Sequence, residues 1–284
     1  MLLRLAKLSA IPHGLLFGER RPGLIILAYH RVGGETASEI DVPVGLFERQ
    51  MAHLREHYTV VPLDLVIGDL QKLLAAGHDL IAVTFDDGSA DVYEHAFPVL
   101  QRYQLPATVY LATAYIDERR PFDFGTYRGG GDHPQPLSWP QVREMAGSGL
   151  VTIGAHTHTH IDLTRVPVET GREELERSRG LIEDRAGTMA RHFAYPWGAV
   201  TPAARALVAE YFSTGVRGGT AKNIPGTIDR MAMWRRPIQQ GDGFALFRLK
   251  LRSYLDGEEA LRGIAARWRH NGQERWSEGR PLAT

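Results

Sequence analysis

Residues 80–88 have the sequence Leu-Ile-Ala-Val-Thr-Phe-Asp-Asp-Gly, an apolar run that ends in two carboxylates and a glycine. The run is short and contains β-branched residues, which predicts a buried strand. Successive side chains of a strand point to opposite faces, so Asp86 and Asp87 can share one site only if the strand ends there and the chain turns. Gly88 permits such a turn. For this segment alone, a plain Asp-Gly turn is the alternative.

The rest of the chain alternates between apolar runs and helical periodicity. Strands are predicted at residues 24–30, 58–61, 107–111, 151–153, 191–195 and 212–216, and helices at residues 46–57, 63–76, 89–103, 139–147, 167–186 and 202–211. Such alternation predicts an α/β fold with a parallel sheet and crossover helices. About seven units suit a single distorted or incomplete (β/α)₇-type barrel.

Polar residues at the carboxyl ends of barrel strands belong to the active-site face. His30, the pair Asp86 and Asp87, residues 156–160 and residues 195–197 all stand at or just past the ends of predicted strands. We therefore expect these residues to converge in space.

The composition excludes several classes of function. The 284 residues carry 33 basic and 33 acidic side chains, so no overall field attracts nucleic acid, and we expect no nucleic-acid partner. The chain has no cysteine, which excludes disulfides, thiolate metal sites and cysteine nucleophiles.

The first residues raise the question of targeting. The uncharged run at residues 8–18 contains Pro12 and is too short to span a bilayer, and no small-residue cleavage site follows it. The leucines within residues 2–8 suggest a short amphipathic helix that packs on the protein, with peripheral membrane attachment as the alternative. We expect a cytoplasmic or membrane-peripheral protein with no signal peptide.

Three motifs occur together in this chain. They are Thr-Phe-Asp-Asp-Gly at residues 84–88, His156-Thr157-x-x-His160, and Phe-Ala-Tyr-Pro-Trp-Gly at residues 193–198. In this order they resemble the motifs of the polysaccharide deacetylase family, the NodB-type enzymes of carbohydrate esterase family 4. The resemblance predicts a NodB-like domain at residues 23–241, with helical extensions at residues 1–22 and 242–284.

The resemblance implies a metal site made by Asp87, His156 and His160. One carboxylate oxygen and two imidazole nitrogens with an open position suit a catalytic zinc ion. We expect one divalent ion, zinc first, with Co²⁺, Ni²⁺ or Fe²⁺ as alternatives. Both imidazoles can face one point if residues 156–160 make a helical turn, and His158 would then point elsewhere. A His-rich surface loop is the other interpretation.

The two catalytic residues come from the same resemblance. It assigns Asp86 as the general base, although from the residues alone Asp86 and Asp87 are interchangeable. It assigns His30 as the general acid, because residues 27–30, Leu-Ala-Tyr-His, are similar to an early Tyr-His segment in the exopolysaccharide subgroup. The family's late Leu-x-His motif is not found here. A buried structural histidine is the alternative for His30.

The third motif would form a wall of the substrate groove. Tyr195 and its neighbours could offer a backbone N–H to an oxyanion, and Trp197 a flat face to a sugar ring, although a core aromatic is the alternative for Trp197. Arg191 lies too far from Tyr195 to match the family's base-orienting arginine. Arg235 or Arg236 could replace it, and we assign Arg236 to the substrate side of the groove.

Together these features predict a metal-dependent hydrolase of carbon–nitrogen bonds that removes N-acetyl groups from N-acetylated sugars or polysaccharide. Alternatives within the hydrolases are another small amide or a lipid- or nucleotide-linked sugar. Two further alternatives are an inactive carbohydrate-binding relative and a non-haem iron oxygenase, whose two-histidine, one-carboxylate site has the same ligands. The glycine-rich stretch at residues 121–136 predicts a surface loop, and long loops of this kind are often functional.

Overall fold

A computed structural model describes residues 19–34, 36–68, 74–75, 77–125 and 134–253 of the 284-residue chain. The chain divides into two compact units, residues 21–247 and residues 1–20 with 248–284. The extensions and the cellular location expected from the termini stay predictions, because residues 1–18 and 254–284 lie outside the described part. Among the described residues, no helix is long and apolar enough to cross a membrane.

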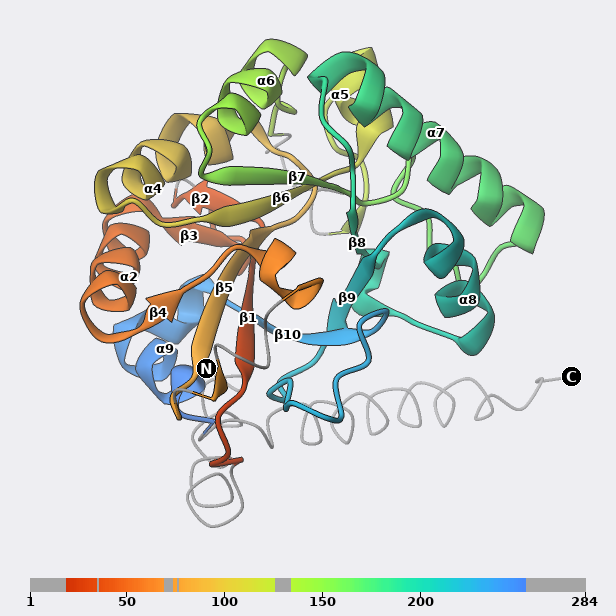
Figure 1. Cartoon of the computed structure of the whole chain (residues 1–284). Coiled ribbons are helices and arrows are strands. Elements are labelled where there is room, and N and C mark those ends of the chain that lie inside the picture. The colour runs from red at the N-terminus through yellow and green to blue at the C-terminus, as the bar shows by residue number, and fades with distance from the viewer. Residues whose placement is uncertain (1–18, 35, 69–73, 76, 126–133, 254–284) are drawn as a thin grey trace, which may run out of the picture. The chain divides into compact units, whose positions relative to one another are not determined.

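The larger unit is built on a closed ring of seven parallel strands (Figure 1). They are β1 (Leu24–Tyr29), β5 (Leu80–Phe85), β6 (Ala107–Leu111), β7 (Val151–Ala155), β8 (His192–Ala194), β9 (Thr214–Gly218) and β10 (Met233–Pro237). β1 pairs with β5 on one side and β10 on the other, which closes the ring and confirms the predicted barrel. The shortest pairing between neighbouring strands of the ring is that of β7 with β8, which share the single pair Ala155 and Phe193.

Three short strands accompany the ring. β4 (Thr59–Val60) pairs with the first residues of β5. β2 (Arg31–Gly33) and β3 (Asp41–Pro43) form a separate two-stranded sheet directly after β1. His30 is the one residue between β1 and β2, so it stands at the carboxyl end of a barrel strand, as predicted.

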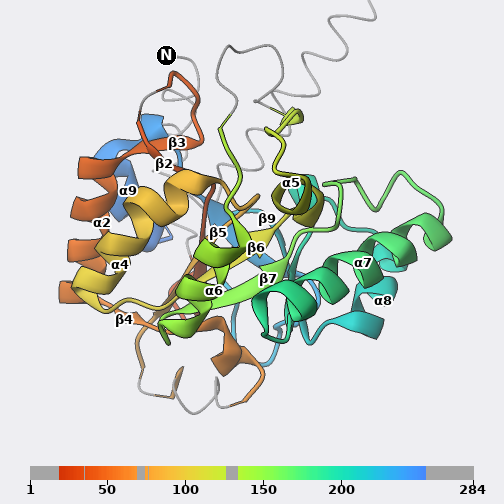
Figure 2. The same ribbon diagram turned by 90° about the horizontal axis from the view of Figure 1, so that it is seen from above.

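Helices between the strands lie outside the ring (Figures 1 and 2). They include α2 (Val44–His57), α4 (Phe97–Tyr103), α6 (Trp139–Gly147), α7 (Val168–Ala186) and α8 (Pro202–Tyr211), and α9 (Gly243–Leu251) follows β10. The predicted bounds of α6 and α8 are confirmed at both ends. Local capping explains this: Ser138 forms a capping box at α6, and the Thr201 side chain accepts the Ala204 N–H at α8.

Side chains that point into the barrel change from apolar to polar along the strands. Leu80 and Ala82 of β5 belong to a buried apolar cluster with Leu24, Ile26, Tyr110, Ala194, Val216 and Met233. Every second residue of a strand shares a face, so Thr84 and Asp86 continue the inward row of Leu80 and Ala82. Both are buried, Asp86 with 3 % exposure. The apolar row thus leads directly to a carboxylate.

Residues 63–76 do not form the single helix that their periodicity predicts. The structure has a short 3₁₀ helix, η1 (Leu63–Val66), and residues 69–73 and 76 lie outside the described residues. Leu63 and Val66 join the buried cluster of the barrel. The Asp64 carboxylate lies 3.1 Å from His192 Nε2 and accepts a hydrogen bond from the Thr152 hydroxyl. These tertiary contacts outweigh the local helical preference.

Two other elements differ from prediction. The helix expected at residues 89–103 begins with a π-helical turn, η2 (Val92–Ala96), which leads into α4. α5 (Thr113–Glu118) was not predicted, because six residues are too few to show a helical period. Residues 126–133 of the glycine-rich loop lie outside the described part.

We expect Asp64→Asn to lower the free energy of unfolding by no more than about 1 kcal/mol at pH 7, because the Asp64 side chain is 41 % exposed and solvent weakens its pairing. A hydrogen bond from His192 is the main reason that the pKa of Asp64 is lowered. A carboxylate with a lowered pKa stabilises the fold above its unfolded pKa of about 3.9, and this contribution is lost as the pH falls through the folded value. Urea unfolding at pH 7 and pH 3 measures the difference between the two proteins. An equal difference at both pH values would contradict the expectation.

Candidate active site

The turn after β5 brings both adjacent carboxylates to one pocket. Asp87 has a φ of 71° and Gly88 a φ of 85°, so the strand ends where the sequence predicts. Glycine is required at position 88 for two reasons. Its positive φ is unfavourable for other residues, and a Cβ there would lie 2.9 Å from Leu111 Cδ2. The pocket has a volume of about 260 Å³ and is open to solvent at the carboxyl ends of the strands. Asp86, Asp87 and His30 all line it.

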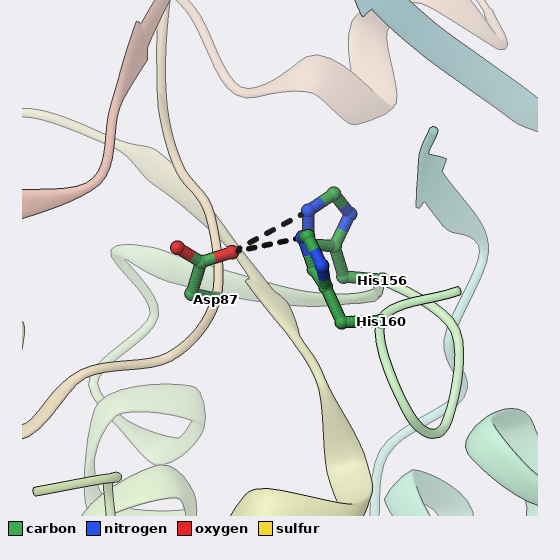
Figure 3. A group of neighbouring side chains, drawn as sticks. All are labelled: Asp87, His156 and His160. Carbon is green, nitrogen blue, oxygen red and sulfur yellow. Dashed lines mark ion pairs between the residues drawn. The ribbon is translucent and has the colours of Figure 1, made fainter. Parts of the chain in front are cut away.

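Asp87, His156 and His160 form a compact set of possible metal ligands (Figure 3). Asp87 Oδ1 lies 3.5 Å from His156 Nε2 and 3.5 Å from His160 Nε2, and all three ligand atoms lie within 4.8 Å of one another. Tetrahedral ligands about 2.1 Å from a zinc ion stand about 3.4 Å apart. These residues therefore fit a divalent ion by the type of their atoms and by their spacing.

The orientation of His156 supports the same use. Its Nδ1 lies 2.7 Å from the Ala194 carbonyl oxygen and donates to it, because a carbonyl oxygen can only accept. Its other ring nitrogen, Nε2, faces Asp87 and His160. Metal-binding histidines are commonly held in this way through their second nitrogen.

His160 is kept neutral by its surroundings. Burial and the nearby His156 lower the pKa of His160 to about 2. The ring of Phe124 stacks on His160 with centroids 3.6 Å apart and an angle of 7° between the planes. A neutral, firmly packed imidazole is the form that ligates a metal.

The loop between the two histidines is bent rather than helical, contrary to the turn expected from their spacing. Thr157 has a φ of 60° and His160 a φ of 62°. Of the seven non-glycine residues with positive φ in the described chain, four belong to the site motifs: Asp87, Thr157, His160 and Trp197. Backbone strain of this kind concentrates at functional sites. His158 points away, as predicted, with Nδ1 2.9 Å from the Thr113 hydroxyl.

Asp86 is held by Arg235 through two parallel contacts. Arg235 Nη1 lies 2.5 Å from Oδ1 and Nη2 lies 2.6 Å from Oδ2, and both side chains are buried. Burial raises the pKa of Asp86, but the charges of Arg235 and His156 outweigh it, so the pKa lies well below its usual value. Asp86 is therefore ionised at neutral pH with a fixed orientation.

Arg236, which the sequence analysis assigns to the substrate side, does not line the pocket. Its Nε donates to the Thr220 carbonyl oxygen at 2.7 Å. The reason is the alternation of β10, a strand that was not predicted because two arginines and a proline are atypical of a barrel strand. Arg235 has the inward position and meets Asp86, and Arg236 has the opposite one.

We expect Arg235→Met to lower the free energy of unfolding by about 3–5 kcal/mol, since it leaves a buried carboxylate without its partner. Burial would then dominate and raise the pKa of Asp86. Because Asp86 is the expected general base and must be ionised to act, the acid limb of kcat/KM should move to higher pH. Urea unfolding and pH–rate profiles measure the two effects. Arg236→Met is the matched control, which should leave the acid limb in place. A profile unchanged in Arg235→Met would contradict the assigned pairing.

The remaining predicted residues also stand at the pocket. His30 Nε2 lies 3.9 Å from Asp86 Oδ2, and its side chain is 28 % exposed. Trp197 is 57 % exposed, and its ring meets those of His160 and Phe124 edge to face. Tyr195 lines the pocket, but its N–H donates to the Val216 carbonyl oxygen and its hydroxyl to that of Met231. The Tyr195 N–H is thus unavailable to an oxyanion.

Several lining residues escaped sequence reasoning. Phe124 and Gly125 belong to the glycine-rich stretch, which was expected to be functional without any named contact, and Ile40, Gly218 and Pro237 carried no signal. The carboxyl ends of β1, β5, β7, β8, β9 and β10 all contribute to the pocket, which confirms the expected convergence.

The site lies at the carboxyl end of a parallel barrel, which is the face on which barrel enzymes carry their active sites. The model of one family, described as polysaccharide deacetylase, matches residues 75–216, and the chain belongs to this family. Among solved structures, IcaB from Ammonifex degensii superposes with a TM-score of 0.69 at 25 % identity, covering 83 % of this chain and 97 % of IcaB. A polysaccharide deacetylase from Bacillus cereus gives 0.67 at 25 % identity, covering 81 % and 69 %.

Two sequence relatives carry names of the same kind. YxkH of Bacillus subtilis (strain 168), provisionally named a polysaccharide deacetylase, is 26 % identical over 182 residues, 63 % of this chain and 58 % of YxkH. The poly-β-1,6-N-acetyl-D-glucosamine N-deacetylase of Escherichia coli (strain K12) is 31 % identical over 144 residues, 48 % of this chain. The chain spans less than two thirds of YxkH, and the match covers 20 % of the E. coli enzyme.

Proposed function

We propose that this protein is a metal-dependent deacetylase that removes N-acetyl groups from the sugars of a polysaccharide. The observation that carries the proposal is the close association of the donor set Asp87, His156 and His160 with a second buried carboxylate, Asp86, oriented by Arg235. Amide hydrolysis needs both an electrophile for the carbonyl oxygen and a base for water.

The ion has a defined part in this proposal. A divalent ion held by Asp87, His156 and His160 would supply Lewis acidity to the acetamide carbonyl and to water. We propose zinc, because one oxygen and two nitrogen ligands with an open position are typical of catalytic zinc sites. Other divalent ions that accept nitrogen and oxygen ligands are outcomes of the metal analysis.

The protein's own groups move the protons. Asp86 accepts the proton that water loses as its oxygen bonds to the carbonyl carbon, and Arg235 keeps the accepting oxygens in place. His30 donates a proton to the amide nitrogen as the carbon–nitrogen bond breaks, so that acetate and a free amine leave. The 3.9 Å between His30 Nε2 and Asp86 Oδ2 allows both groups to reach one acetamide.

The first substrate to test is β-1,6-linked N-acetylglucosamine. Relatives from Escherichia coli and Staphylococcus aureus are named for activity on that polymer. The exposed face of Trp197 at the pocket supports a sugar substrate, because flat aromatic rings pack well against apolar faces.

The two-histidine, one-carboxylate set is also the ligand set of non-haem iron oxygenases. Asp86 favours hydrolysis, because an oxygenase site needs no second carboxylate held ionised beside the ligands. An inactive binding relative has no need of the Asp86–Arg235 pair either.

The test combines metal analysis of the purified protein with acetate release. Substrates are β-1,6-linked N-acetylglucosamine oligomers, β-1,4-linked oligomers of the same length, the monosaccharide and a simple acetamide. We expect about one zinc ion per chain and acetate from the β-1,6 oligomers first. Acetate release from the acetamide or the monosaccharide alone would show that the substrate is a small amide rather than a polymer. Bound iron with oxygen consumption would favour the oxygenase, and no bound metal would refute the proposal.

A further inference from the structure

We propose that Glu174 is a positioning residue that holds the loop between His156 and His160 and thereby sets the affinity of the site for its metal ion. This inference rests on the proposed metal site. Glu174 belongs to α7, a helix rich in charged residues. Unlike its exposed neighbour Glu173, Glu174 is partly buried and directed at the loop.

The Glu174 carboxylate makes three hydrogen bonds to two consecutive loop residues. Oε2 accepts from the backbone N–H of His158 and from that of Thr159, each at 2.8 Å. Oε1 accepts from the Thr159 hydroxyl at 2.8 Å. Hydrogen bonds to an ionised acceptor are shorter and stronger than neutral ones. One side chain thus fixes the segment immediately before His160.

The other side of the loop is held by the start of α5. The Ala114 N–H donates to the His158 carbonyl oxygen at 2.8 Å, and the Thr113 hydroxyl lies 2.9 Å from His158 Nδ1. Residue 158 is therefore held by its N–H, its carbonyl and its side chain. The loop lies between α5 and α7, and the two ligand histidines are at its ends.

The loop needs such support because its backbone is strained. Thr157 and His160 both have left-handed φ values, which non-glycine residues adopt at a cost unless the surroundings hold them. Without Glu174, two backbone donors of the loop would lose their acceptor, and the loop could relax away from the conformation that turns His160 Nε2 toward Asp87. Partners outside the ligand shell commonly contribute 10–100-fold to metal affinity.

The test is a zinc titration of the folded, metal-free 284-residue chain against a chromogenic chelator. The variants are Glu174→Ala, Glu174→Gln and the adjacent control Glu173→Ala. We expect Glu174→Ala to weaken zinc binding by about 10–100-fold. Glu174→Gln, which keeps one acceptor oxygen, should lie between it and the wild type, and Glu173→Ala should match the wild type. Thermal unfolding of each metal-free variant separates affinity from stability.

The outcomes distinguish the two proposals. A wild-type protein that binds no zinc would remove the proposed metal site itself. Wild-type affinity in Glu174→Ala, even with a lower melting temperature, would show a purely structural role and overturn the positioning proposal. If Glu174→Ala does not fold, Glu174→Gln decides in the same way: weaker zinc binding supports the proposal, and unchanged binding overturns it.

Discussion

Asp86→Asn is expected to lower kcat of the folded, metal-loaded protein by about 10²- to 10⁴-fold, the usual contribution of a general base. Asparagine has nearly the shape of aspartate, but its amide does not accept a proton at neutral pH. Asp86 is not one of the three residues proposed to bind the metal ion, so the metal content should stay close to that of the wild type. Loss of turnover with retained metal is the result that identifies a base.

The same substitution also removes a charge from the buried pair with Arg235, so stability must be measured beside activity. Asp79→Asn is a matched control, because Asp79 lies just before the first residue of β5, whereas Asp86 lies just after the last. The Asp79 carboxylate lies 2.9 Å from Nζ of Lys222, a buried cation like Arg235. We expect this control to lose stability and to keep its turnover per folded molecule. Wild-type turnover in metal-loaded Asp86→Asn would show that another group takes the proton.

His156→Ala is expected to remove the metal ion and all measurable deacetylation. The substitution deletes one of two nitrogen donors and leaves Asp87 and His160 as an incomplete set. Loss of a direct ligand should weaken metal binding by more than the roughly 10–100-fold that loss of an outer partner causes. Elemental analysis of the purified variant, together with acetate release at saturating zinc, measures both effects.

His158→Ala is the control from the same loop. His158 is buried like His156, but its ring contacts Thr113 and points away from the donor set. We expect this variant to retain zinc within about tenfold of the wild type, a loss no larger than an outer partner causes. Equal loss of metal in both variants would mean that loop folding, rather than ligation by His156, controls the site.

Local sequence patterns were sufficient for much of the fold and for the composition of the site. The apolar run before Asp86 predicts a buried strand, and helical periodicity predicts helices at residues 139–147 and 202–211, which the structure has at the same residues. These features depend on neighbours within a few positions, so the sequence contains them directly. The convergence of His30, Asp86 and His156 also follows from a general rule, since the carboxyl ends of parallel strands meet at one end of a barrel.

Other features depend on contacts between residues far apart in the chain. Whether Arg235 or Arg236 meets Asp86 depends on the register of β10 against β1, where Arg235 lies beside Ile26. A shift by one residue would exchange the two side chains. Likewise, residues 63–66 form the short 3₁₀ helix η1 because Leu63 and Val66 pack into the buried cluster of the barrel. Glu174 meets the histidine loop only because α7 packs against it. Local periodicity and motif spacing contain no information about such pairings, whereas the tertiary structure fixes the partner of each side chain.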